Sequence, residues 1–480
     1  MIWRAAVPIA TGVAVALLPV PAGLEPSAWY YVAIFTAVIA GLITEPLPPS
    51  AVGFIGVTLA AAAGLPFSAA QRQAPGFRLP AEAVRWALAG FSNSTVWLIF
   101  AAFVFAMGYE KTGLGRRVAL LMVRHLGHRA LGLGYAVAFS DVLLAPFTPS
   151  NTARSAGMIY PVIRNIPELY GAGAGAAARP FGTALMWTAF ATTCVTSSMF
   201  MTALAPNLFL VDLARTTTGV EITWVDWMVG FLPVGVLLLL VVPWLTFRLH
   251  PADTPAGSAV PQWAASALVA MGPVSRRELG MAGLALLSLT LWIVAGAVLD
   301  PTLVAMVAVS LMLLARIVTW EDVLGHTSAW NVLAWFATLV VLADGLNRVG
   351  FVAWLGQGAA AQLAGFPPLL VVTLLVALFF LMHYAFAGIT AHAVAVAPVF
   401  LAAGAAIEGL PVRTFVMLLG FSLGLMGVLT PYATGPAPLY YGCGLIDRRE
   451  FWRLGSLFGL LFLAALLGIG LPWLQAIAPR

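Results

Sequence analysis

The sequence carries little charge. Only 9% of its 480 residues are Asp, Glu, Lys or Arg, whereas a soluble domain carries roughly 25%, so a soluble fold is excluded. Hydrophobic residues make up 61%, and apolar runs long enough to cross a membrane recur along the chain. A membrane β-barrel would show short alternating segments instead. We therefore expect an all-α polytopic membrane protein.

Catalytic and metal-binding motifs are also missing. The sequence contains no HExxH, no phosphate-binding GxxxxGK[ST] and no GxSxG, the motifs of membrane proteases, ATP-driven pumps and hydrolases. The two cysteines, Cys194 and Cys443, have no metal-ligand spacing, and we interpret them as packing residues. The sequence also has no pair of carboxylates within the membrane, which would have indicated a proton relay or a metal site. We expect no enzyme activity, no cofactor, no metal and no nucleic-acid partner.

The apolar runs predict the membrane topology. Eleven full crossings are expected near residues 5–22, 28–46, 50–66, 94–108, 181–211, 228–248, 280–299, 302–318, 328–343, 411–442 and 453–476. Two further segments, 130–165 and 368–407, each contain two apolar legs of only about 14 to 20 residues. They are broken at Pro146–Ser150 and at Ala387–Thr390. Each is predicted to be a re-entrant helical hairpin.

Basic residues predict the orientation. Of the 23 lysine and arginine residues, 15 fall on the side of the N-terminus and 7 on the other side, and Arg154 lies within a hairpin. Because an excess of basic residues marks cytoplasmic loops, the N-terminus is expected in the cytoplasm and the C-terminus outside. The preference for arginine over lysine and the absence of a transit-like start favour a bacterial inner membrane over a plastid.

The second half of the chain repeats the first. Lys111–Gly115 matches Arg348–Val352 and Met158–Ile163 matches Ala395–Phe400, both at an offset of 237 residues. An odd number of elements separates the copies, which predicts an inverted repeat with a substrate site near the midplane. The expected domains are scaffold helices in 1–92, transport elements of repeat 1 in 93–227, scaffold helices of repeat 2 in 228–327, and transport elements of repeat 2 in 328–480.

The first hairpin tip carries groups suited to an anion. Pro149 stops one leg, and Ser150 or Asn151 can cap the helix that follows. The positive end of that helix, with Thr152 in its first turn, would then face a bound anion. The alternative is a capped turn that binds no ligand.

Arg154 is the most informative single residue. A guanidinium at membrane depth costs roughly 3 to more than 10 kcal/mol unless water, a partner or a ligand compensates it. Two interpretations stay open. Arg154 either binds a substrate carboxylate through two parallel N–H donors, or forms a structural ion pair with Asp141 on the other leg.

The second tip reads His383–His392. Here Thr390 can cap the helix and donate to an anion, with Ala391 beside it. His392 can donate one hydrogen bond when neutral and two when charged. The alternative for His392 is a hydrogen bond to a neighbouring carbonyl.

Two of the expected crossings are interrupted. The segment Thr430–Pro438 contains three prolines and a glycine, which break the hydrogen-bond ladder and free backbone groups. A milder interruption, Thr202–Asn207, occurs in the first half. We expect Thr434, Gly435 and Pro436 to contact substrate. Candidates for holding a cation, or for positioning the residues that bind the anion, are Thr202, Asn207 and Asp141.

These motifs resemble the divalent anion:sodium symporter family over nearly the full length of the chain. The similar stretches are Pro149–Arg154, Thr390–His392 and Tyr432–Pro438. The residues in these stretches are similar to those of one branch of the family, the 2-oxoglutarate/malate translocators and the citrate or tartrate/succinate antiporters. The resemblance implies a homodimer in which a transport domain bearing both hairpins moves as an elevator against a scaffold.

One departure bears on mechanism. Sodium-coupled members of the family repeat Ser-Asn-Thr at both tips, whereas this chain has Thr390-Ala391-His392 at the second tip. Our hypothesis is that Arg154, with His392, supplies the positive charge that sodium supplies elsewhere. The predicted function is therefore exchange of di- or tricarboxylate anions. The alternative is a sodium-coupled dicarboxylate or sulfate symporter, in which case sodium is a partner.

Overall fold

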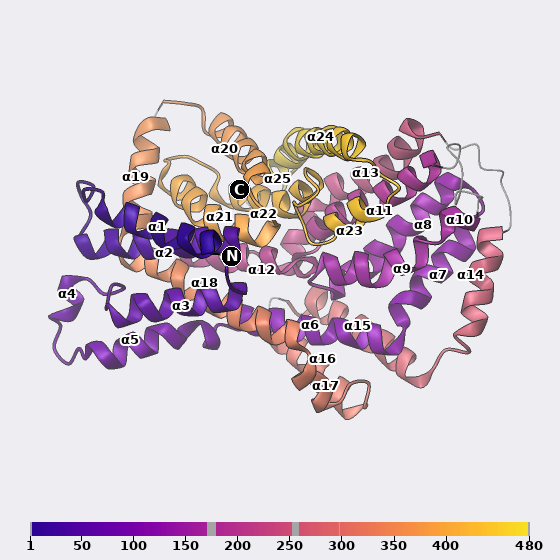
Figure 1. The fold of residues 1–480 in the computed structure, drawn as a ribbon, viewed down its shortest axis with the longest axis horizontal. Helices are drawn as coiled ribbons and strands as arrows, with labels where there is room; N and C mark the ends of the chain where they lie inside the picture. Colours follow the sequence, from indigo (N-terminus) through magenta and orange to yellow (C-terminus); the bar gives the residue numbers. More distant parts are fainter. Residues whose placement is uncertain (1, 170–178, 252–258, 297, 364, 479–480) are drawn as a thin grey trace.

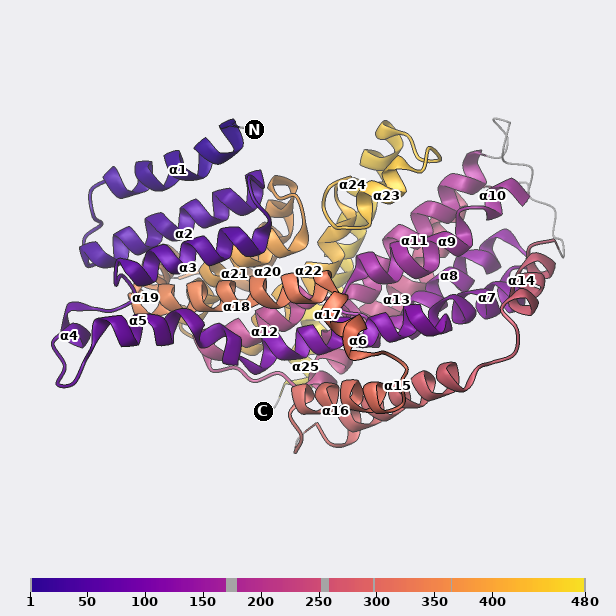
Figure 2. The same ribbon diagram turned by 60° about the horizontal axis from the view of Figure 1, so that its bottom comes forward.

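The computed structural model describes residues 2–169, 179–251, 259–296, 298–363 and 365–478. Within these ranges the chain is helical and has no β-strand, as the composition predicts. Helices of the first part are α1 (Ile2–Leu17), α2 (Pro26–Thr44), α3 (Pro49–Ala62), α4 (Ala69–Arg72), α5 (Leu79–Leu88), α6 (Ser94–Thr112) and α7 (Leu114–Leu126). Figure 2 shows α1, α2 and α3 side by side at one edge of the molecule.

The first hairpin and the helices after it follow. They are α8 (Ala130–Leu144), a π-helical segment (Thr152–Ile159), α9 (Tyr160–Ile163), α10 (Ile166–Leu169), α11 (Arg179–Met199), α12 (Ala205–Thr218), α13 (Trp224–Leu249) and α14 (Ala259–Ala270). Proline or glycine stands at each interruption of the apolar runs, as Pro146 does after α8 and Pro206 at the start of α12. Pro146 and Pro206 thus interrupt the helical structure, although the apolar sequence continues on both sides of each.

The second repeat completes the chain. Its helices are α15 (Arg276–Val294), α16 (Pro301–Leu314), α17 (Trp320–Gly325), α18 (Thr327–Arg348), α19 (Phe351–Leu363), α20 (Pro368–Met382), α21 (Ile389–Ala406), α22 (Val412–Leu425), α23 (Ala437–Gly442), α24 (Arg448–Ala465) and α25 (Leu471–Ile477). In Figure 1 the helices α4 and α14 lie at opposite ends of the longest axis.

The helices reproduce the predicted repeat. Helices α7 and α19 each contain 13 residues and begin 237 residues apart, at Leu114 and Phe351. A glycine with positive φ precedes each, Gly113 at +77° and Gly350 at +78°. Figure 1 shows α8, α9 and α11 on the right of the molecule and their counterparts α20, α21 and α22 to the left of them. The two hairpins therefore approach the middle of the molecule from opposite sides.

The number of helices that are long enough to cross a membrane is smaller than the number of crossings that the sequence predicts. Among the described residues, eight helices are long and apolar enough to cross a membrane, or nine if the bent pair α5 and α6 counts as one span. Three of the predicted crossings appear as the shorter helices α1, α3 and α16, and two appear as the broken pairs α11–α12 and α22–α23. The eight also include legs of both hairpins. The count of eleven stays a prediction.

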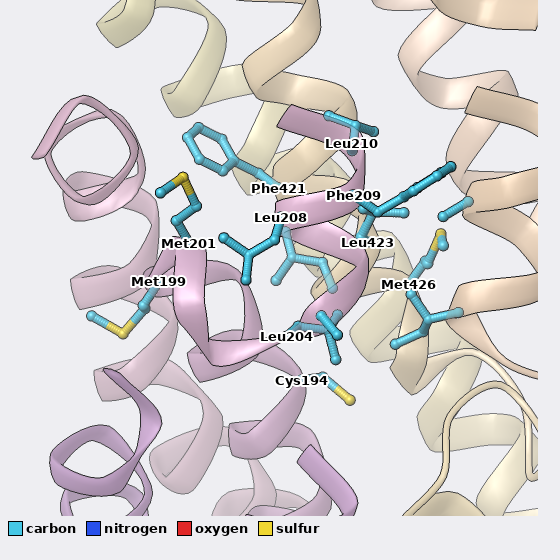
Figure 3. Close-up of a cluster of buried hydrophobic side chains, with 14 of the residues drawn as sticks. Cys194, Met199, Met201, Leu204, Leu208, Phe209, Leu210, Phe421, Leu423 and Met426 are labelled. Atoms are coloured by element: carbon cyan, nitrogen blue, oxygen red, sulfur yellow. The ribbon is translucent and has the colours of Figure 1, made fainter. Parts of the chain in front are cut away.

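Apolar packing surrounds the break between α11 and α12. Figure 3 shows Met199, Met201 and Leu204 around this break, with Phe421 and Leu423 of α22 beside them. All five side chains are buried. Because close packing fixes these side chains, the broken helix has a defined position relative to α22.

Candidate functional site

The four interruptions of the chain meet at one cavity. It has a volume of about 230 Å³ and lies where the two hairpin tips meet the start of α12 and the segment before α23. From these elements the lining residues are Pro149, Ser150, Asn151, Thr152, Leu204, Ala205, Pro206, Ala387, Gly388, Ile389, Thr390, Ala391, Thr434 and Gly435. Both repeats thus contribute to one site, as the sequence predicts for a repeat interface.

The first tip is held to its own repeat by hydrogen bonds. The Ser150 Oγ accepts from the N–H of Ala153 at 3.2 Å, which confirms the predicted cap. The N–H of Ala205, at the start of α12, donates to the carbonyl of Pro149 at 2.9 Å. The helix after Ser150 begins as a π-helix, a form that often occurs at functional sites.

The first tip also contacts the broken helix of the second repeat. Asn151 Nδ2 donates to Thr434 Oγ1 at 2.7 Å, and both side chains are buried. Gly435 lies so close to Thr152 that a Cβ atom at this glycine would be 1.9 Å from Thr152 Oγ1. Four of the predicted substrate-binding residues therefore form a single contact between the repeats.

The second tip presents an open helix start. Its N-cap is Gly388, whose φ of +111° is a conformation that glycine adopts easily. No side chain caps α21, so the N–H groups of Ile389, Thr390 and Ala391 have no partner within the helix. The prediction that Thr390 caps this helix is wrong, because the helix begins one residue before it. Thr390 instead lines the cavity from inside the first turn.

Arg154 lies behind the first tip and not among the cavity-lining residues. Its side chain is 0% exposed, and Nε is 3.2 Å from both carboxylate oxygens of Asp141. Nη1 donates to the carbonyls of Thr148 at 3.0 Å and Ala203 at 3.1 Å. Nη2 donates to the hydroxyls of Thr193, Thr196 and Ser197. Of the two interpretations for Arg154, the geometry matches the ion pair with Asp141.

His392 lies behind the second tip, also outside the cavity lining. Its imidazole is buried, and the ring centroids of Phe379, Phe386 and His383 lie 4.5, 4.9 and 5.2 Å away. The neighbouring His383 bonds through Nε2 to the carbonyl of Ala433 at 2.8 Å, and Nε2 must be the donor because a carbonyl only accepts. This bond ties the second hairpin to the broken helix of its own repeat.

The three candidates for holding a cation or positioning the anion-binding residues lie inside the first repeat. Thr202 Oγ1 donates to the carbonyl of Pro146 at 2.6 Å, and Asn207 Nδ2 donates to the carbonyl of Ser197 at 2.8 Å. Thr196 donates to the Asp141 carboxylate. The bonds to Pro146 and Asp141 join the hairpin to the broken helix, and the Asn207 bond joins the two halves of that helix, so this geometry is that of positioning residues. Pro436, predicted to contact substrate, is the N-cap of α23 and is not among the lining residues.

The opposite wall of the cavity was missed from the sequence. It is built by Leu42 and Glu45 of α2 and its C-cap, Pro49 of α3, Phe103 of α6, and Val332, Trp335 and Phe336 of α18. Most are ordinary apolar residues of long helices, which no motif distinguishes. Glu45 is the lining residue on this wall that the sequence could have indicated, because it is an acidic residue that is followed by proline and ends an apolar run. Among the described residues that line the cavity, none is Lys, Arg or His.

Comparison with known proteins agrees with this architecture. The family described as "Sodium:sulfate symporter transmembrane region" matches residues 1–478. Two bacterial proteins named L-tartrate/succinate antiporter, from Shigella flexneri and from Escherichia coli strain K12, are each 47% identical over 478 residues, which is 99% of this chain and 98% of theirs.

Solved structures support the fold alone. The YdaH transporter of Alcanivorax borkumensis aligns with a TM-score of 0.60 and 17% identity over 90% of this chain and 99% of its own. The Neisseria gonorrhoeae MtrF structure, described as illuminating a class of antimetabolite efflux pumps, aligns with a TM-score of 0.58 and 12% identity over 92% of this chain and 97% of its own.

Proposed function

Since the chain belongs to the sodium:sulfate symporter transmembrane family, we propose that it exchanges small di- or tricarboxylate anions across a bacterial inner membrane. The observation that carries this proposal is the cavity shared by both hairpin tips and both broken helices. Its volume of about 230 Å³ suits a small organic acid. The name of the 47% identical relatives, L-tartrate/succinate antiporter, supports exchange rather than symport.

In our proposal the anion is held by dipoles and hydroxyls rather than by a cationic side chain. The uncapped N–H groups at the start of α21 donate to one carboxylate, because the positive end of a helix favours a negative charge. The hydroxyls of Thr152 and Thr390 are further donors. Thr434 Oγ1 accepts from Asn151 at 2.7 Å and keeps its own O–H for the substrate. Ser150, Ala391 and Gly435 complete the contact surface.

Arg154 takes the place that a bound cation would have. Carboxylate, carbonyl and hydroxyl oxygens converge on its guanidinium, and these are the ligand types that hard cations prefer. With this position filled by a covalently attached charge, we propose that the first tip needs no sodium. His392 supports the second tip by packing against Phe379 and Phe386.

Exchange follows from the cost of an empty cavity. Without substrate, the free N–H groups and hydroxyls of the tips would enter the barrier unsatisfied, and each buried unsatisfied group costs about 1 to 3 kcal/mol. A bound anion satisfies them, so the loaded carrier crosses more easily. In this proposal the transport elements, which include both hairpins, move as an elevator against the scaffold that contains α2 and α3, the protein is a homodimer, and the N-terminus lies in the cytoplasm.

Proteoliposomes test the proposal. Uptake of labelled succinate, tartrate, malate, 2-oxoglutarate, citrate and sulfate is measured with succinate-loaded or empty vesicles, and with sodium or choline outside. We expect carboxylate uptake only into loaded vesicles, with the same rate in both salts. Sodium-dependent uptake into empty vesicles would instead establish the symporter, and a preference for sulfate would refute the carboxylate assignment.

A further inference from the structure

A carboxylate lines the cavity in which the anion is proposed to bind. Glu45 is the only ionisable side chain among the described lining residues. A negative group at an anion site weakens the binding of every anion, and it weakens the binding of more highly charged anions more. We infer that Glu45 is a specificity-determining residue that limits how much negative charge a substrate can carry. This inference rests on the proposed function and narrows its substrate class to dicarboxylates over tricarboxylates.

Glu45 lines the cavity on the side formed by α2, α3, α6 and α18, away from the hairpin tips. It is the C-cap of α2 in a left-handed conformation, φ 47° and ψ 54°, and its N–H donates to the carbonyl of Gly41 at 2.9 Å. These features fix its backbone at the cavity edge. The groups proposed to bind the anion belong to the tips and broken helices, so attraction and repulsion come from different walls.

No described residue that lines the cavity carries a positive charge to cancel that of Glu45. Among the described residues, Glu45 has no ion-pair partner, and it is an exposed residue that lines the cavity. The negative end of α2 and the positive start of α3, whose first residue Pro49 also lines the cavity, oppose each other. The unit charge of the carboxylate remains. The buried Arg154 cannot offset it, because Asp141 already pairs with that guanidinium.

Repulsion by one carboxylate scales with the charge of the substrate. For an exposed group roughly one side-chain length from the ligand, Coulomb's law in a water-like dielectric gives about a two- to fourfold loss of affinity per substrate charge. The charge of Glu45 therefore lowers the affinity for a trianion by this factor three times and the affinity for a dianion of similar size only twice. Removing the charge should improve the binding of both, and of the trianion by the larger factor.

The experiment compares Glu45→Gln with Glu25→Gln. Glu25 lies at the other end of α2, where it is the exposed N-cap and does not line the cavity. At pH about 8, where succinate is a dianion and citrate a trianion, the KM of each is measured in vesicles loaded with succinate. We expect E45Q to lower the ratio of citrate KM to succinate KM by about two- to fourfold, and E25Q to leave it as in the wild type.

Two further measurements keep the inference testable if E45Q folds poorly. E45D retains the charge and should retain the wild-type ratio. In the wild type, raising the salt concentration should lower the citrate to succinate KM ratio, because salt screens an exposed charge. An unchanged ratio in E45Q, or a wild-type ratio indifferent to salt, overturns the role of Glu45 while leaving exchange established. A wild type that exchanges no carboxylate overturns both proposals.

Discussion

Arg154 and Asp141 form an ion pair that closes the first hairpin across its own tip. Asp141 lies near the end of α8 and Arg154 in the π-helical segment, and their side chains are 1% and 0% exposed. The pair sits behind the cavity and also bonds to α11 through Thr193 and Thr196. It therefore fixes the shape of the first tip without lining the cavity.

Removing the carboxylate should destabilise the protein strongly. Asp141→Asn leaves a buried guanidinium without its counter-charge, and breaking such a pair costs about 3 to 5 kcal/mol. We expect a lower thermal unfolding midpoint in detergent. The control is Asp344→Asn, which breaks the half-exposed pair with Arg348 and should cost no more than about 1 kcal/mol. Equal midpoints for the two variants would contradict the structural role.

Removing the guanidinium should abolish exchange. Arg154→Ser leaves the Asp141 carboxylate without its counter-charge and the carbonyls of Thr148 and Ala203 without this donor, so the first tip loses its fixed geometry. Arg154→Lys keeps the charge but cannot make the same set of planar bonds, and should retain partial activity. Both are assayed as succinate exchange in proteoliposomes. Exchange at the wild-type rate by R154S would refute a role for this residue in the transport cycle.

A single methyl group added at Gly435 should disrupt the contact between the two repeats. Gly435→Ala places a Cβ atom 1.9 Å from Thr152 Oγ1 and 3.2 Å from Thr152 Cβ, so Thr152 or the backbone at this contact must shift. We expect at least a tenfold loss of exchange. Gly442→Ala, at the end of the nearby α23, meets no atom within 4 Å and should behave like the wild type. A Gly435→Ala variant with normal kinetics would show that the tip and the broken helix are not packed as described.

The hydrogen bond between Asn151 and Thr434 should contribute to substrate affinity. Thr434→Val keeps the shape but removes both the acceptor of Asn151 Nδ2 and the O–H that we propose donates to the substrate, and leaving a bound carboxylate one hydrogen bond short costs about 1 to 3 kcal/mol of binding free energy. We expect the KM for succinate to rise by roughly five- to a hundredfold. In the control Thr373→Val, the lost hydroxyl bonds only to the carbonyl of Leu369 in its own helix. A similar KM for both variants would argue against Thr434 as a binding residue.

Much of the fold follows from local signals. The hairpins were located because Pro146 and Pro149 interrupt one apolar segment and Gly388 another, and proline and glycine both disfavour a continuous helix. The wrong prediction for Thr390 also came from a local preference, that of threonine for the N-cap position. A threonine is a good N-cap, but Gly388 already supplies the turn, and the helix starts before the threonine is reached.

The sequence alone determined the membrane class, the two hairpins and the repeat at an offset of 237 residues, and it predicted the tips that line the cavity. Each depends on run length, spacing or a helix-breaking residue. Only the tertiary structure decided that Arg154 pairs with Asp141, that His392 packs among aromatic rings and that Glu45 lines the cavity. These outcomes depend on which side chains are brought together by the packing of helices far apart in the chain, and local sequence does not specify that packing.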